Sequence, residues 1–399
     1  MNLKNILVLL GIVVLFISYL KINEIINFSD SNLNEVNVKY QNNKNISTPL
    51  PMEHIVKIDD ELLIGAGLDY PKIFISKEYW TNPIKSGSLF SFNTKTNELK
   101  ELEIENFPKG VKFHPHGLTL YKDNTEKYYL FIINHSIKTN PEDNEERIEK
   151  VLLEINKPKI SLTFKNTYSL PMNYFGTLNS IAVINFNTIY FTTHSYFPLP
   201  SFSIDENIDN YLNRIKYQIF DKINILFQKL NIKKTYLYSF DLEKRKINLI
   251  NNSEGLFNHG LAYNPDKSLL YMARPFERDI KIFEISRNYP SKALLINTIK
   301  TIYNAKNIFY DIDNQKIYAG IYGSNKELIS LENSYIQFGN FDDITSFGGF
   351  EEIDVSNDYE ITELILMKDM IKGVSSGIKV NNNIYLTSTY QNEIFVYQK

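Results

Sequence analysis

The 399-residue sequence contains no cysteine, so disulfide bonds, thiolate metal sites and cysteine nucleophiles are excluded. It also lacks a Gly-x-Ser-x-Gly nucleophile elbow, a P-loop and a dinucleotide-binding fingerprint. The formal net charge is only −3, and no block of lysine or arginine is present. Nucleic acid is therefore not an expected partner.

Glycine and proline are modest in number, at 16 and 14, whereas tyrosine and phenylalanine are abundant, at 27 and 26. Aromatic residues are enriched in strands, so this balance favours β-structure over helix. The hydrophobic content of 43% and charged content of 22% are typical of a globular protein with enough apolar surface for a core.

A long uncharged hydrophobic run extends from Ile6 to Leu20 and is flanked by lysines. As a helix this run would rise about 22 Å, which is less than the roughly 30 Å thickness of the hydrocarbon core of a membrane. A run of this length is typical of the hydrophobic core of a signal peptide. No small-x-small cleavage site follows it, so a retained signal anchor over residues 1–24 is the leading interpretation. A cleaved signal of a secreted protein and a buried helix are the alternatives. The polar segment 25–50 would then tether an extracytoplasmic body to the membrane.

Five similar stretches begin at residues 116, 179, 259, 307 and 376. Each opens with a polar residue, usually followed by a small one, and continues as a strand, a polar turn and a second strand. Residues 61–102 supply a sixth unit, and stacking such units radially gives a β-propeller. We therefore predict an all-β, six-bladed propeller over residues 51–399. A strand from the beginning of this body would pair with the last strand, "EIFVYQK", and close the ring.

The innermost strand of each blade begins near the propeller axis, so the opening residues of the units converge there. They are His116, Asn179, His259, Asn307 and Ser376, with Glu53 ahead of the first blade. A buried polar ring must be hydrogen-bonded, hydrated or bound to metal. His135 ends the second strand of the His116 blade, where it could orient His116. His114 is interpreted as structural.

These segments resemble the paraoxonase/arylesterase family. The likeness covers nearly the whole body and is carried by short segments in conserved order: "EHIVKIDDELLIGAGLDYP", "FHPHGLTLY", "YYLFIINHS", "LNSIAVI", "THSYF", "FNHGLAYNPD", "NIFYDID" and "GVSSGIKVNNNIYLTSTY". The resemblance implies a six-bladed propeller that hydrolyses lactones and aryl esters with a calcium ion in its channel. His116 and His135 match the histidine pair that activates water.

The resemblance also assigns the calcium-ligand positions, and two of them depart from the family. The five positions are Glu53, Asn179, His259, Lys306 and Asn307, where His259 replaces an asparagine and Lys306 replaces an aspartate. Calcium prefers hard oxygen ligands, and an ammonium would repel it. Lys306 could point away from the axis, or pair with Glu53 and fill the place of the ion.

Three descriptions of the central cation stay open at this point. One is a weakly held calcium ion on Glu53, Asn179, Asn307 and His259. Another is a zinc ion, because His259 adds a nitrogen ligand. The third is the Lys306 ammonium itself. The second, structural calcium of the family is not expected, since its two aspartate positions hold His54 and Ser180.

Two further segments interrupt the strand pattern. Residues 201–232 carry apolar side chains at helical spacing, which predicts a helical insertion between the second and third strands of the third blade. This helix could pack on its own blades, or serve as a lid or membrane contact. Residues 338–360 are acidic and contain glycine, so we expect a solvated loop there.

The leading interpretation is a hydrolase of lactones or carboxylic esters, with His116 as general base, His135 in support and a cation polarising the carbonyl. An alternative is a catalytically degenerate propeller that binds a small molecule or a protein partner. A metal-free enzyme similar to strictosidine synthases is a third interpretation. The expected partners are a small ester or lactone and, through the amino terminus, a membrane.

Overall fold

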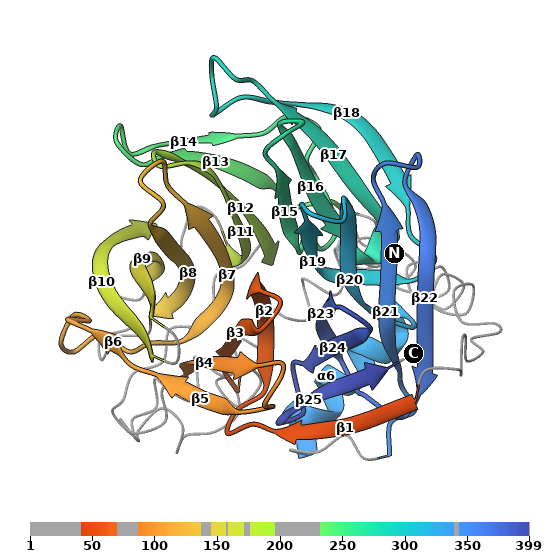
Figure 1. Ribbon diagram of the computed structural model, residues 1–399. Coiled ribbons are helices and arrows are strands. Elements are labelled where there is room, and N and C mark those ends of the chain that lie inside the picture. The colour runs from red at the N-terminus through yellow and green to blue at the C-terminus, as the bar shows by residue number, and fades with distance from the viewer. Residues whose placement is uncertain are drawn as a thin grey trace, which may run out of the picture.

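Short apolar strands joined by Asn- and Asp-rich turns pair with their sequence neighbours, because a tight turn returns the chain antiparallel to itself. The computed structural model describes residues 41–69, 87–136, 145–156, 159–170, 176–195, 232–338 and 343–398. Within these ranges the strands form six sheets, and Figure 1 shows them arranged as a ring around one axis. The protein is thus an all-β, six-bladed propeller, as the repeats predict.

The first three blades follow the chain from the centre of the ring outward. Their strands are β2 (Met52–Asp59), β3 (Leu62–Gly67), β4 (Ser88–Asn93) and β5 (Leu99–Leu102) in blade 1; β7 (Pro115–Lys122), β8 (Tyr128–Ser136), β9 (Glu145–Asn156) and β10 (Lys159–Leu170) in blade 2, with β6 (Ile104–Glu105) parallel to β10; and β11 (Thr177–Asn185), β12 (Thr188–Ser195), β13 (Leu237–Asp241) and β14 (Lys246–Leu249) in blade 3.

The remaining blades repeat this order. Their strands are β15 (Leu261–Asn264), β16 (Leu269–Arg274), β17 (Asp279–Ile285) and β18 (Ala293–Lys300) in blade 4; β19 (Asn304–Asp311), β20 (Lys316–Tyr322), β21 (Phe347–Asp354) and β22 (Glu360–Lys368) in blade 5; and β23 (Val374–Val380), β24 (Asn383–Ser388), β25 (Glu393–Gln398) and β1 (Gln41–Ser47) in blade 6. A single turn of 3-10 helix, η2 (Pro275–Glu277), follows β16.

The ring is closed by β1, which pairs antiparallel with β25 at the outer edge of blade 6 (Figure 1). One sheet therefore joins the beginning and the end of the described chain, and the edge of β25 is covered. Strand β1 lies inside segment 25–50, which we expected to be a tether. The propeller thus includes residues 41–47, ahead of residue 51; the strand starts with five polar residues and so gave no apolar signal.

The core lies between the blades rather than within any one of them. Each of the six larger clusters of buried apolar side chains combines residues from two neighbouring sheets. For example, Tyr271 and Ile282 of blade 4 are buried with Ile317 of blade 5. Since no blade buries both faces alone, the fold requires the complete ring.

The six innermost strands, β2, β7, β11, β15, β19 and β23, contact one another in this cyclic order. Two glycines, Gly117 after His116 and Gly260 after His259, permit the close approach of neighbouring inner strands. A Cβ on Gly117 would lie 2.2 Å from the carbonyl oxygen of Asn179, and one on Gly260 would lie 2.7 Å from the Cα of Asn307. These glycines explain the small residue after the polar opening of the repeats.

Helix α6 (Asn325–Phe338) connects β20 to β21 and was not expected. Its start carries a recognisable signal, because Ser324 and Glu327 have capping-box spacing. The Ser324 hydroxyl accepts a hydrogen bond from the backbone N–H of Glu327 at 3.1 Å. The helix follows the second strand of blade 5.

The expectation of a solvated loop over the acidic segment 338–360 was wrong for residues 347–354. Its residues 347–354 form β21, the third strand of blade 5. Glu352 is paired with Lys379 at 2.8 Å. Glu351 is buried and accepts a hydrogen bond from the backbone N–H of Ile302 at 3.0 Å. Burial raises the pKa of Glu351 to about 7. Pairing and protonation allow these acidic residues to lie in a sheet.

Two sequence predictions fall outside the described residues: the anchor at 1–24 and the helical insertion, of which residues 201–231 are not described. The insertion lies in the sequence between β12 and β13 of blade 3. Within the described ranges, no helix is long and apolar enough to cross a membrane.

Candidate functional site

The polar openings of the inner strands meet at the axis of the ring. Glu53, His116, Asn179, His259 and Asn307 come from blades 1, 2, 3, 4 and 5, and each is at most 3% exposed. The sixth opening residue, Ser376, donates a hydrogen bond from its hydroxyl to the backbone carbonyl of Glu53 at 3.1 Å. The structure therefore brings all six side chains together, and their interactions divide into three groups.

The first group is a row of two imidazoles and a carboxylate within blade 2. The Nε2 atom of His135 lies 2.9 Å from Nδ1 of His116, and the Nδ1 atom of His135 lies 2.8 Å from Oε2 of Glu146. Glu146 and His135 are paired in register on β9 and β8, and both are fully buried. Nε2 of His116, at the other end of the row, lies 3.5 Å from Oε1 of Glu53.

The proton positions in this row follow from the acceptor at its outer end. An ionised Glu146 can only accept, so Nδ1 of His135 carries hydrogen, and Nε2 of a neutral His135 then accepts from Nδ1–H of His116. This leaves a lone pair on Nε2 of His116. Burial lowers the pKa of His116, and the neighbouring Glu53 carboxylate offsets this only partly. His116 is thus neutral at pH 7, and its Nε2 atom faces the axis beside Glu53.

The second group is an ion pair between blades 1 and 5, closed by a hydroxyl from blade 6. The Lys306 ammonium lies 2.8 Å from Oε1 of Glu53 and donates to Oγ1 of Thr389 at 2.6 Å. The Thr389 hydroxyl in turn donates to Oε2 of Glu53 at 2.6 Å. Burial alone would raise the pKa of Glu53, but the Lys306 ammonium and the His116 and His259 rings together outweigh burial and hold this pKa well below its usual range. Glu53 is therefore a carboxylate.

The third group is a chain of hydrogen bonds across blades 3, 4, 5 and 1. The amide of Asn307 donates to the backbone carbonyl of Glu53 at 2.9 Å, and its Oδ1 lies 3.0 Å from Nδ1 of His259. The Nε2 atom of His259 lies 3.0 Å from Nδ2 of Asn179. Because a backbone carbonyl can only accept, the direction of every bond is fixed. The Oδ1 atom of Asn179 is left buried with no hydrogen-bond partner.

These interactions test whether the side chains fit a calcium ion. Four of the five ligand positions are engaged with one another or with the chain, and Lys306 provides a cation where a cation would bind. Imidazole is a poor calcium ligand, and only one carboxylate, Glu53, is among the five. Within the described ranges, no three His, Asp or Glu side chains are grouped to hold a metal ion. The donor set does not fit calcium.

The two residues at the positions of the second calcium are also used by the protein itself. Nδ1 of His54 accepts a hydrogen bond from the backbone N–H of Leu118 at 2.8 Å. The hydroxyl oxygen of Ser180 accepts from the backbone N–H of Leu261 at 3.0 Å. Burial lowers the pKa of His54 to about 4. Both side chains thus join neighbouring inner strands, and neither offers a carboxylate.

Three residues near the axis were missed by the sequence analysis. Glu146 lies in the acidic stretch "PEDNEER", which resembles an ordinary surface loop, and Thr389 is one of many hydroxyl residues. His194, in the quoted segment "THSYF", has its ring centroid 5.9 Å from that of His116 and 5.5 Å from that of Phe257. His114 has a structural contact, as expected, because its Nδ1 lies 2.9 Å from the backbone oxygen of His135.

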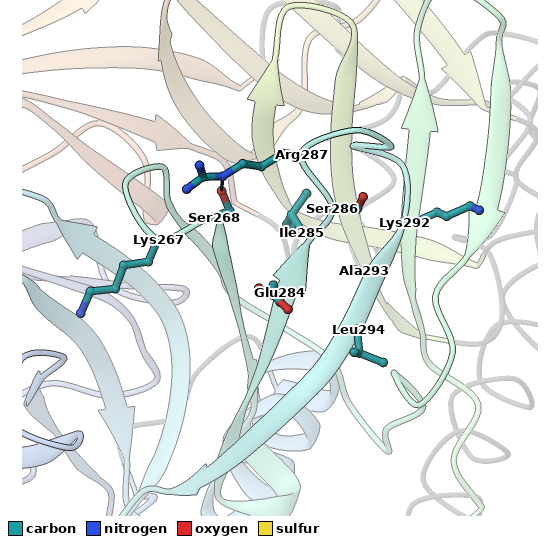
Figure 2. A pocket seen from close by; sticks show the side chains of 9 residues that line it. All are labelled: Lys267, Ser268, Glu284, Ile285, Ser286, Arg287, Lys292, Ala293 and Leu294. Atoms are coloured by element: carbon teal, nitrogen blue, oxygen red, sulfur yellow. Dashed lines mark hydrogen bonds between the residues drawn. The ribbon is translucent and has the colours of Figure 1, made fainter.

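A separate pocket lies at the outer part of blade 4, between β16, β17 and β18 (Figure 2). Its volume is about 500 Å³, and its lining includes Ser268, Glu284 and Arg287. The lining contains none of the axial residues. Its charged side chains point in different directions in Figure 2, so they do not converge on a common ligand position.

Comparison with known proteins identifies the family of this chain. The profile of the family described as Arylesterase matches residues 52–337. The chain is 23% identical over 250 residues to human serum paraoxonase/arylesterase 2, covering 62% of this chain and 60% of that protein. Mouse serum paraoxonase/arylesterase 1 is 25% identical over 242 residues, covering 59% and 57%. The chain thus matches about 60% of the length of the human relative.

Solved structures that resemble the fold include a luciferin-regenerating enzyme, with a TM-score of 0.45, 9% identity, and coverage of 88% of this chain and 92% of that chain. A putative gluconolactonase has a TM-score of 0.44 and 8% identity, with coverage of 89% and 91%. Since the family profile matches more than half of the sequence, the chain belongs to the arylesterase (paraoxonase) family.

Proposed function

We propose that the protein hydrolyses lactones or carboxylic esters at the axis of the propeller. The observation that carries the proposal is the buried row formed by Glu146, His135 and His116, which ends at Nε2 of His116 on the propeller axis. Burying two imidazoles and a carboxylate costs desolvation free energy. Their use is to orient the His116 imidazole so that it can remove a proton from water. Family membership supports the same reaction class.

The reaction follows from the positions of these groups. A water molecule near Nε2 of His116 gives up a proton to this atom while its oxygen bonds to the acyl carbon. The carbonyl electron pair moves onto the carbonyl oxygen. When the tetrahedral intermediate collapses, the bond between the acyl carbon and the alkoxy oxygen breaks. His116 returns its proton to the leaving oxygen, so that one ester and one water yield an acid and an alcohol.

A binding propeller without catalysis is the second candidate. It is favoured by the Glu53–Lys306 ion pair, because this pair occupies the positions at which the family resemblance implies a metal ligand set. Such a protein would retain the fold and the axial polar groups but would not turn over a substrate. The strictosidine-synthase-like reaction stays a prediction from the sequence.

The test is hydrolysis of a panel of lactones and aryl esters by the full-length protein and two variants. His116→Gln should lower kcat/KM by roughly 100-fold or more, the usual scale for a lost general base. His54→Asn is the matched control, since Asn can also accept the hydrogen bond from Leu118, and it should retain activity. Circular dichroism would verify folding. The proposal would be wrong if wild type and His116→Gln had equal activity, or if wild type cleaved no member of the panel.

The location of the protein is a separate proposal that rests on the sequence. The uncharged run from Ile6 to Leu20 supports a retained anchor with the propeller outside the cytoplasm. The protein should then remain in the membrane fraction after a high-salt wash and keep its original amino terminus. Release of the protein into the medium with a terminus between residues 18 and 30 would favour a cleaved signal instead.

A further inference from the structure

The axial site has a lysine where the family resemblance implies a calcium-binding aspartate. We propose that the ammonium of Lys306 is a catalytic group that binds the carbonyl oxygen of the substrate, and that hydrolysis consequently requires no metal ion. This inference rests on the proposed hydrolase function. It explains why a site with a poor calcium ligand set still carries the complete histidine row.

The ammonium is held in one position by three blades. Lys306 lies on β19 of blade 5, its partner Glu53 lies on β2 of blade 1, and Thr389 follows β24 of blade 6. Its contacts to Glu53 and Thr389 use two of the three N–H donors of an ammonium. One donor is left for a ligand. Because Lys306 is only 5% exposed, a charge-assisted hydrogen bond from it would be little weakened by water.

The position of this donor relative to the base fits one reacting carbonyl group. Nζ of Lys306 and Nε2 of His116 both face Oε1 of Glu53, at 2.8 and 3.5 Å. Their separation therefore cannot exceed the sum of these two distances. Within such a span, the lysine can donate to the carbonyl oxygen while His116 deprotonates the attacking water. The negative charge that develops on this oxygen is then stabilised by a preorganised cation.

The other ligand positions support a fixed cation rather than a removable ion. His259 contributes both ring nitrogens to the Asn179–His259–Asn307 chain. Because Nε2 accepts from Asn179 and only Nδ1 carries hydrogen, the ring is neutral and adds no second positive charge. Each oxygen of the Glu53 carboxylate already has a partner, Lys306 on Oε1 and Thr389 on Oε2. A divalent ion would have to displace the ammonium and break this chain.

The experiment compares the full-length protein before and after dialysis against EDTA, with metal content measured by mass spectrometry. We expect metal-free wild type to retain its hydrolytic activity and calcium to leave its Tm unchanged. Lys306→Met should lower kcat by about 100-fold or more, the scale of a lost oxyanion donor. Lys281→Met is the matched control, because Lys281 is equally buried, in blade 4, and should retain activity.

Lys306→Asp supplies a readout that does not depend on turnover. It removes the ammonium and adds a second carboxylate, so millimolar calcium should raise its Tm by several degrees while the Tm of wild type stays constant. Loss of wild-type activity in EDTA with recovery in calcium, or a calcium-dependent Tm in wild type, would overturn the proposal. If wild type cleaves no substrate, the hydrolase function fails, and the two melting curves still decide whether Lys306 occupies the place of the ion.

Discussion

The Nδ1 atom of His116 and the Nε2 atom of His135 are 2.9 Å apart, with both rings buried and tilted by 50° to each other. Two neutral imidazoles and two flanking carboxylates create three donor–acceptor gaps but supply only two protons. The gap between His116 and Glu53 is the longest, at 3.5 Å, and it is the one without a proton. A water molecule that donates to both atoms would complete the row.

Glu146→Gln tests the outer end of the row. Glutamine can still accept from Nδ1–H of His135, so the tautomers are retained while the negative charge is lost. Without this charge the imidazolium formed during proton transfer is less stable, so kcat should fall by roughly tenfold. The acid limb of the pH–rate profile should also move to lower pH. A loss of activity without a shift of that limb would mean that Glu146 only supports folding.

Glu53→Gln tests the axial ion pair by stability. It would leave the Lys306 ammonium buried without a counter-charge, which should lower the free energy of unfolding by about 3–5 kcal/mol. Adding Lys306→Met to Glu53→Gln removes the unpaired charge and should recover part of this loss. Urea denaturation of wild type, both single variants and the double variant gives the coupling energy. Additive effects would show that the two residues do not interact in solution.

The buried histidines predict a loss of stability in mild acid. Burial lowers the pKa of His54 and of His114 to about 4 from 6.5, and it also lowers those of His116, His194 and His259. Between pH 6.5 and 4 the unfolded chain therefore binds protons that the folded protein does not. Each of His54 and His114 should lower the free energy of unfolding by about 1.4 kcal/mol per pH unit over this window.

Two buried carboxyl groups act in the opposite direction, because burial raises the pKa of Glu277 as well as that of Glu351. The pKa of Glu351 is raised to about 7, so its contribution to stability is lost as the pH rises through that value, and it offsets about one of these protons. Denaturant titrations at several pH values should still show that the free energy of unfolding falls as the pH is lowered towards 5. His54→Asn should reduce the slope of the free energy of unfolding against pH by the amount that corresponds to about one proton. A stability that does not change between pH 7 and 5 would contradict the burial of these histidines.

Strand β1 should be required for stability. A variant beginning at Gln41 keeps this strand, whereas one beginning at Thr48 exposes the edge of β25 and removes Ile46 from the cluster between blades 6 and 1. We expect the shorter variant to lose at least about 2–5 kcal/mol, the usual effect of deleting one buried aliphatic side chain. Thermal melting of the two variants measures this difference, and equal Tm values would argue against closure by β1.

Gly260→Ala should disturb the site through the backbone. The added Cβ would meet the backbone of Lys306, Asn307 and Ile308 at 2.5–2.7 Å, so β15 and β19 must separate. We expect a loss of about 1–3 kcal/mol, typical of overpacking, and reduced activity. Gly110→Ala is a control for the loss of a glycine elsewhere: nothing lies within 4 Å of its Cβ, although its φ of +78° adds local strain. Its activity should match that of wild type.

The periodic pattern of polar opening, apolar strand and turn was sufficient to predict six blades and the polar ring at the axis. This succeeded because the side-chain alternation of a strand and the chemistry of a turn are local properties that sequence records directly. Segments with weak local signals were missed or wrong. Strand β1 consists largely of Asn and Gln residues, and β21 contains acidic residues whose burial depends on partners such as Lys379 from another blade.

The partners at the axis were decided only by tertiary structure. The family resemblance implied that Lys306 replaces an aspartate, but two outcomes were open, because a lysine side chain is long enough to point away or to pair with Glu53. The structure places it 2.8 Å from that carboxylate. Glu146 and Thr389 were not identified, because their roles arise from strand register and ring closure. The ring brings residues such as Glu53 and Thr389, 336 positions apart, into hydrogen-bonding distance, and no local pattern encodes such a contact.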